Sequence, residues 1–114
     1  MKPLIWVASA LVDLKTMPQR VQEEFGFALY LAQLGNRHGK AKPLSGFGSA
    51  GVLEVRQSLA GSTFRAIYLV EFEEAVYVLH CFQKKSKQGI ETPKQDMDLI
   101  RERLKAAQVH AKGD

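Results

Sequence analysis

The chain has 114 residues, a formal net charge of +4 and a sequence pI of about 9.3. This length supplies one modest hydrophobic core without room for a second domain, and a single cysteine excludes an internal disulfide. The mild excess of Lys and Arg favours an anionic partner and leaves a neutral ligand open, while the cysteine usage fits a reducing cytoplasm.

The first residues predict a strand and then a helical turn. Residues 4–7 are apolar, and Ser9 suits the N-cap of a turn over residues 10–14. The apolar run has the length of a signal-peptide core, but Trp6 and the return of charge at Asp13 favour a strand. We therefore expect no membrane segment and a cytoplasmic protein.

Residues 18–35 predict an amphipathic helix of about five turns. Pro18 suits the first turn and Gly35 is a stop signal. Apolar side chains recur between them at steps of four and three residues: Val21, Phe25, Leu29 and Ala32.

Residues 36–51 predict a basic, glycine-rich loop, because they follow neither the helical nor the strand period. Two interpretations stay open for this loop. It is either a solvated connection, or a segment whose Lys40 and Lys42 reach a phosphate backbone.

Three strands follow, over residues 52–57, 64–72 and 75–83. Their connections are short, and a parallel pair needs a crossover of a dozen or more residues, so an antiparallel meander is predicted. Strict alternation along the last strand divides it into two faces: His80, Phe82 and Lys84 on one, and Tyr77, Leu79, Cys81 and Lys85 on the other.

A final helix is predicted from Pro93 to Ala107, with Thr92 as its cap. Met97, Ile100 and Leu104 mark its apolar stripe. The cations at positions 101, 103 and 105 complement the helix dipole and are interpreted as a solvated face, with partner binding as the alternative.

Three stretches carry a family resemblance: WVASALVDLKTMPQRVQEEFGFALYLAQLG, KPLSGFGSAGVLEVRQ and FRAIYLVEFEEAVYVLHCFQKKSKQGIETP. They resemble the phage-derived, HigB-like branch of the RelE/ParE toxin superfamily. The resemblance implies a small α+β domain spanning residues 1–114, ordered strand, helix, three-strand meander, helix. It further implies a twisted antiparallel sheet with helices on one face, and the toxin half of a toxin–antitoxin pair. For RelE-type members it implies messenger RNA cleavage on the ribosome.

Arg56 and Arg65 lie on adjacent predicted strands and could clamp a phosphate. Cleavage of RNA by its own 2′-hydroxyl needs cationic donors for the crowded phosphate, a base and an acid. We expect Arg65 to be exposed, and Lys84 and Lys85 to assist in proton transfer or substrate grip.

The roles of three further residues stay open between packing and substrate contact. His80 is the only side chain of this region with an unperturbed pKa near neutrality, yet it lies in an apolar run. Phe82 could stack on a base. Tyr68 could reach the site of Arg65 only if a β-bulge re-aimed one of them. The histidines are scattered, so no metal site and no cofactor are predicted.

The sequence thus predicts a ribosome-dependent endoribonuclease toxin that works without a metal. Its expected partners are messenger RNA on the ribosome and a cognate antitoxin of the helix-turn-helix type. A non-enzymatic DNA gyrase inhibitor of the ParE type is the alternative, and a basic phage-derived nucleic-acid-binding regulator is a third. Fold by itself does not separate the three.

Overall fold

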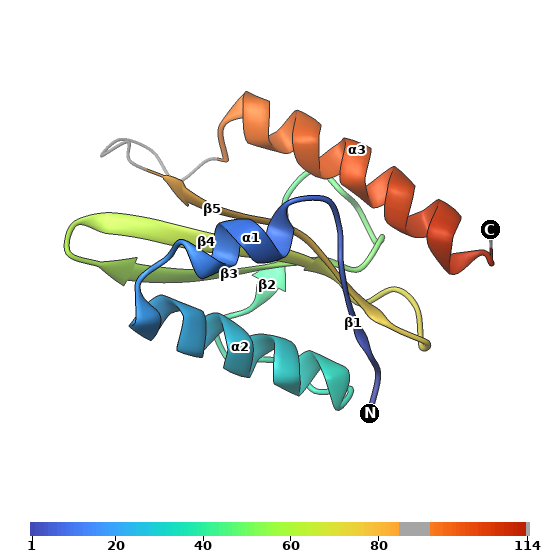
Figure 1. Ribbon diagram of the computed structural model, residues 1–114. Helices are drawn as coiled ribbons and strands as arrows, with labels where there is room; N and C mark the ends of the chain where they lie inside the picture. The colour runs from blue at the N-terminus through green and yellow to red at the C-terminus, as the bar shows by residue number, and fades with distance from the viewer. Residues whose placement is uncertain (85–91, 114) are drawn as a thin grey trace.

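A β-sheet with helices packed on it forms the described part of the chain, residues 1–84 and 92–113 of the computed structural model (Figure 1). The elements are β1 (Leu4–Trp6), α1 (Ala10–Lys15), α2 (Gln19–Gln33), β2 (Lys42–Pro43), β3 (Val52–Leu59), β4 (Ser62–Leu69), β5 (Val76–Lys84) and α3 (Lys94–Ala111). The sheet has five strands in the order β1-β5-β4-β3-β2. The predicted α+β class is confirmed.

The long strands β3, β4 and β5 form the predicted antiparallel meander. Ala60 and Gly61 connect β3 to β4 with φ angles of 53° and 83°, the left-handed pair that a tight hairpin turn requires. β1, however, pairs with β5 in parallel, with Leu4 opposite Val76. The sheet is therefore mixed, and the expectation of a wholly antiparallel sheet is wrong. The chain between β1 and β5 is long enough for the crossover that a parallel pair requires.

The helices cover both faces of the sheet and not one, which corrects the second expectation about the fold. α1 and α2 pack with Ala66 and Tyr68 of β4, whereas α3 packs with Ile67 and Leu69 of the same strand. Figure 1 shows α2 and α3 on opposite sides of the strands. A strand that is apolar on both faces needs cover on both, which is why β4 is buried in the middle of the sheet.

A β-bulge interrupts β5. Ile67 lies opposite His80 and Tyr68 opposite Val78, so Leu79 is an extra residue between them. Leu79 packs in the core beneath α3, and His80 also reaches α3 through Asp96. The strict alternation predicted for this strand is therefore wrong, since Leu79 and His80 serve the same face.

The remaining elements depart from expectation mainly at their ends. α2 is confirmed, whereas α3 runs on to Ala111 and its N-cap residue is Pro93, with no side-chain capping bond. The loop expected over residues 36–51 contains the short strand β2. Ser9 is the N-cap residue of α1, but its hydroxyl bonds to Asp13.

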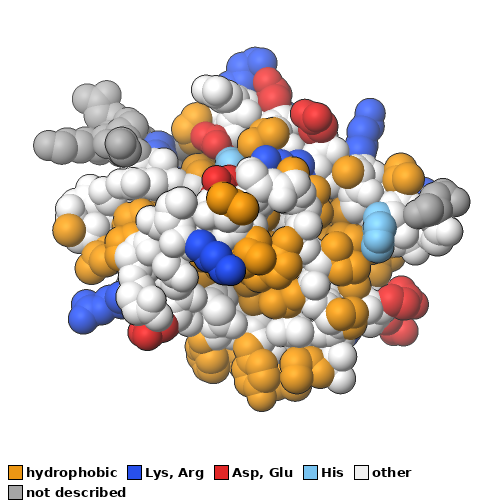
Figure 2. Space-filling view, viewed as in Figure 1, with side chains coloured by type: hydrophobic (Ala, Val, Ile, Leu, Met, Phe, Trp, Pro, Cys, Tyr) orange, Lys and Arg blue, Asp and Glu red, His pale blue; other side chains and the backbone are white. Residues whose placement is uncertain are grey.

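The outer side of α2 carries exposed apolar side chains, Phe27, Tyr30 and Leu34, each about half exposed to solvent. Figure 2 shows apolar side chains gathered over α2, along the lower edge of the view. No helix in the described ranges combines the length and apolar character needed to cross a lipid bilayer.

Candidate functional site

Two arginines and a glutamate form an ion cluster on the sheet face that carries α3. Nε of Arg56 donates to Oε1 of Glu54 at 2.9 Å, and Nη1 of Arg65 donates to Oε2 of Glu54 at 3.2 Å. Arg56 and Arg65 lie on the adjacent strands β3 and β4, as predicted, and the structure makes them direct cross-strand partners. Like charges opposite one another destabilise a strand pair, and the carboxylate of Glu54, which bonds to both guanidinium groups, offsets this repulsion.

The two arginines differ in how far their side chains are buried. The side chain of Arg65 is 2% exposed and that of Arg56 is 30% exposed. Burial lowers the pKa of Arg65, while the charge of Glu54 opposes this shift. The expectation of an exposed Arg65 is therefore wrong, and Arg56 is the arginine of the pair that a ligand can reach.

A cleft of about 580 Å³ lies beside the ion cluster, between residues 42–46 and the start of α3. Lys42, Glu54, Arg56, Thr92 and Met97 are among the residues that line it. Gly46 has a φ of 97°, and a Cβ there would lie only 3.3 Å from Cε of Met97. Glycine thus lets this loop approach α3 and close one end of the cleft.

Thr92, which the sequence predicted as the cap of the final helix, lines the cleft. Its Oγ1 accepts a hydrogen bond from Nη1 of Arg65 at 3.1 Å, so the hydroxyl does not cap α3. Glu54 was also missed as a member of the site. The alternation of β3 places Glu54 and Arg56 on the same face, and this was the signal available in the sequence.

The structure brings Arg56, Arg65 and Lys42 together, but it places other predicted site residues elsewhere. Tyr68 is fully buried among the residues packed under α2, on the opposite face from Arg65, because β4 has no bulge of its own to re-aim either residue. Burial raises the pKa of Tyr68 to about 12. Lys40 is exposed and its Nζ lies 3.5 Å from Oε1 of Gln57, away from the cleft lining.

Lys84, one of the two lysines predicted to assist catalysis, is the last residue of β5. Lys84 is buried, with 8% of its surface exposed. Lys85 lies outside the described residues. Their roles in proton transfer or substrate grip stay predictions.

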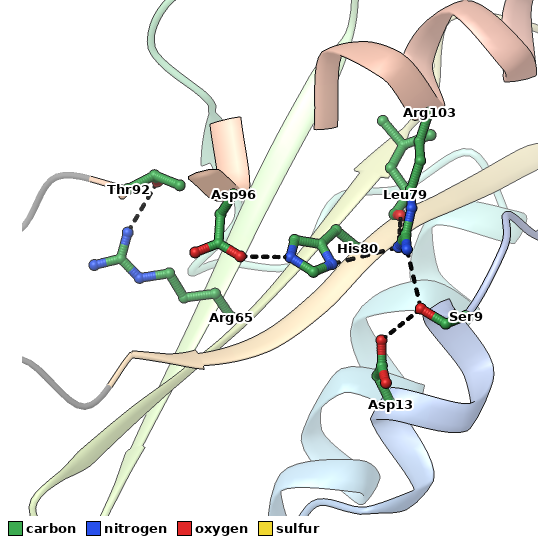
Figure 3. Close-up of polar contacts among 8 residues, drawn as sticks. All are labelled: Ser9, Asp13, Arg65, Leu79, His80, Thr92, Asp96 and Arg103. Atoms are coloured by element: carbon green, nitrogen blue, oxygen red, sulfur yellow. Dashed lines mark hydrogen bonds and ion pairs between the residues drawn. The ribbon is translucent and has the colours of Figure 1, made fainter. Parts of the chain in front are cut away.

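His80 belongs to a buried polar network (Figure 3), and neither His80 nor Phe82 lines the cleft. Their rings stack with centroids 4.5 Å apart, and they are 6% and 9% exposed. Nε2 of His80 lies 2.7 Å from Oδ1 of Asp96, and Nδ1 lies 3.4 Å from Nη1 of Arg103. Both residues line a second hollow of about 500 Å³, beside α1. Contact of His80 or Phe82 with substrate stays a prediction.

Arg103 extends the network from α3 to α1. Its Nη1 donates to the carbonyl oxygen of Leu79 and its Nη2 to Oγ of Ser9, both at 2.9 Å, and Ser9 donates to Asp13 at 2.7 Å. The interpretation of Arg103 as a solvated helix residue is therefore wrong. Arg103 and Ser9 are 94 residues apart in the sequence, so no local pattern indicated this contact.

The surroundings of His80 predict one tautomer. A guanidinium can only donate, so Nδ1 accepts and the proton of the neutral ring lies on Nε2, directed at Asp96. Burial lowers the pKa of His80 and Arg103 lowers it further, whereas Asp96 and, more weakly, Asp13 raise it. The net direction is downward, so the ring is neutral near pH 7.

We expect this histidine to make stability depend on pH. Because its folded-state pKa is below the unfolded value of about 6.5, the unfolded chain binds the proton more tightly than the folded one. The contribution of neutral His80 to the free energy of unfolding should therefore be complete above pH 6.5. It should be lost as the pH drops through the folded-state pKa. Urea unfolding between pH 7.5 and 5 measures it. His80→Gln should flatten the curve, and an unchanged curve would contradict this assignment.

Within the described ranges, no three His, Cys, Asp or Glu side chains group in a way that could hold a metal ion. Cys81 is a buried free cysteine, and burial raises its pKa to about 12. The thiol is therefore a core side chain.

Comparison with protein families gives one match, to a family described as phage-derived protein Gp49-like (DUF891), over residues 12–105. No curated protein and no solved structure gave a match. The matched segment runs from α1 into α3 and contains the ion cluster, the cleft, His80, Asp96 and Arg103. Because the match spans well over half of the chain, the protein belongs to the Gp49-like family of phage-derived proteins, within the RelE/HigB-like toxin group.

Proposed function

We propose that this protein is the toxin of a type II toxin–antitoxin pair and that it cleaves messenger RNA on the ribosome. The observation that carries the proposal is the basic cleft, where Lys42 and Arg56 lie beside a buried carboxylate–guanidinium pair. Membership of a toxin-like family supports the biological role. The chemistry is argued from the cleft.

The cleft is suited to stabilising charge on a phosphate. The 2′-hydroxyl of RNA loses its proton to water as its oxygen attacks the adjacent phosphorus. The bond to the 5′-oxygen breaks, and that oxygen takes up a proton from water. A 2′,3′-cyclic phosphate forms, and negative charge builds up on the phosphate oxygens in the transition state. Arg56 is the accessible guanidinium, and Glu54 orients it through its Nε–H. Arg65, which is buried, donates a hydrogen bond to Glu54 and balances its charge. Lys42 supplies a second cation for the RNA backbone.

The cleft is less well suited to proton transfer than to charge stabilisation. Glu54 is the only acid among the described residues that line the cleft, and each of its oxygens already accepts a bond from a guanidinium. His80 has both ring nitrogens engaged by α3. A ribosome that aligned the 2′-oxygen with the phosphorus would supply the missing rate, since orientation is worth about 7–11 kcal/mol at its limit.

The test is single-turnover cleavage of one labelled messenger, with and without programmed ribosomes. We expect rapid cutting on ribosomes and slow or undetectable cutting of naked RNA. Equal rates would reject ribosome dependence. If neither reaction proceeds and cells instead show gyrase-dependent DNA damage, the ParE-type alternative replaces the proposal.

Two lysine variants test whether the RNA backbone runs through the cleft. Lys42→Ala should weaken messenger binding and its salt dependence, because Lys42 lines the cleft, whereas Lys40→Ala should have the smaller effect, because Lys40 lies near Gln57. Both lysines are exposed and two residues apart, so loss of charge alone would affect the two equally. Binding isotherms at several salt concentrations measure the difference, and equal effects would place the RNA elsewhere.

For neutralisation we propose an antitoxin of the helix-turn-helix type that brings carboxylates to Lys42 and Arg56. Opposite charge would draw it to the cleft, and occupation would exclude the phosphate backbone. A toxin–antitoxin complex in which Lys42 and Arg56 stay accessible would count against this route.

A further inference from the structure

His80 is held between two turns of α3. Asp96 in the first turn accepts from Nε2 at 2.7 Å, and Arg103, two turns later, approaches Nδ1 at 3.4 Å. Figure 3 shows the imidazole between these side chains, with Ser9 and Asp13 continuing the network into α1. One ring of β5 thus ties α3 to the sheet at two points.

The segment that leads into α3 also forms part of the cleft. Thr92 lines the cleft and accepts a hydrogen bond from Nη1 of Arg65 at 3.1 Å. The same nitrogen donates to Glu54, which in turn orients Arg56. A shift of the first turn of α3 relative to β5 would therefore move Thr92 against Arg65 and disturb the ion cluster.

We propose that His80 is a positioning residue that sets the geometry of this cleft. Its Nε2–H bond to Asp96 holds the start of α3, and through Thr92 it holds Arg65 and Glu54 in register with Arg56. The effect on cleavage rests on the proposed function, whereas the effect on the geometry of Arg65 does not. His80 acts on the cleft through Asp96, because it does not line the cleft itself and α3 engages both of its ring nitrogens.

Two substitutions of His80 separate positioning from packing. Glutamine places a side-chain N–H near the original Nε2, so His80→Gln keeps a donor for Asp96. Asparagine ends near the original Nδ1, so His80→Asn can accept from Arg103 but does not reach Asp96. Both lose the ring that stacks on Phe82, so a role limited to packing would affect the two variants alike.

The first measurement is the ¹⁵Nε–Hε resonance of Arg65, which reports its local geometry whether or not the protein cleaves RNA. We expect this resonance to move in His80→Asn and to stay near its wild-type position in His80→Gln. The second measurement is cleavage on programmed ribosomes. His80→Asn should lose about 10²-fold in kcat with KM little changed, and His80→Gln should restore most of the rate.

Asp96→Ala removes the same contact from the other side, together with a charge that acts directly on Arg65, and guards against failure of His80→Asn to fold. It should reproduce both effects. Asp98→Ala is the control, because Asp98 lies in the same turn but is exposed and pairs only with Lys94 and Arg101 among the described residues. Equal behaviour of the two His80 variants, or an unmoved Arg65 resonance in His80→Asn and Asp96→Ala, would overturn the inference. If the wild-type protein has no nuclease activity, the proposed function is rejected. The Arg65 resonance then still tests whether His80 positions Arg65.

Discussion

Replacing Arg56 by alanine is expected to slow messenger cleavage on the ribosome by about 10²- to 10³-fold, the cost of removing one donor from a developing oxyanion. Arg56 is the exposed member of the arginine pair and lines the cleft, so its loss removes charge stabilisation from the transition state. Glu54 keeps its bond to Arg65, so the fold should survive. The rate constant for single-turnover cleavage measures the effect, and thermal unfolding checks the fold.

Arg20→Ala is the matched control for Arg56→Ala. Arg20 is an exposed arginine in the first turn of α2, on the other face of the sheet, and its loss removes the same formal charge. Arg56→Lys should recover only part of the rate, since a lysine lacks the planar fork that Glu54 orients. Full activity in a folded Arg56→Ala protein would remove Arg56 from the site and with it the central role of the cleft.

Replacing Glu54 by glutamine is expected to lower the free energy of unfolding by about 3–5 kcal/mol, the cost of breaking a buried ion pair. The substitution keeps the shape of the side chain but leaves two guanidinium charges directly opposite one another without the intervening carboxylate charge. Such a loss is a large part of the stability of a domain of this size. Urea unfolding near pH 7 measures it.

A double substitution separates charge from packing at this position. Arg65→Met in the background of Glu54→Gln removes the buried charge that Glu54 balanced, and it should recover part of the lost stability. Glu102→Gln is the control, because Glu102 is exposed on α3 and its change should stay within about 0.5 kcal/mol. A Glu54→Gln protein as stable as the control would mean that the carboxylate does not hold the arginines.

Arg65→Ala, unlike Arg56→Ala, is not a clean test of catalysis. Arg65 is buried against Glu54 and Thr92, so alanine there would disturb the cleft and the fold together. The pattern of a strand shows which residues share a face, but not how far a neighbouring helix covers that face. Burial of Arg65 depends on where α3 lies, and this is set by contacts across the sheet.

The sequence by itself determined the elements whose signal is periodic and local. Val21, Phe25 and Leu29 repeat with the helical period, which predicted α2. The short connections between β3, β4 and β5 determined the antiparallel meander, and with it the adjacency of Arg56 and Arg65. The likeness to toxin families was also readable from sequence, and the family match agrees with it.

Only the tertiary structure decided the features that join distant residues. The parallel pairing of β1, the bulge at Leu79 and the position of α3 on the opposite face from α2 all depend on packing between elements. The bulge brings Leu79 and His80 to one face, where Asp96 meets the imidazole. Local patterns cannot encode such contacts, because each requires two segments to be placed by the whole core, and the free energy of that placement is spread over many side chains.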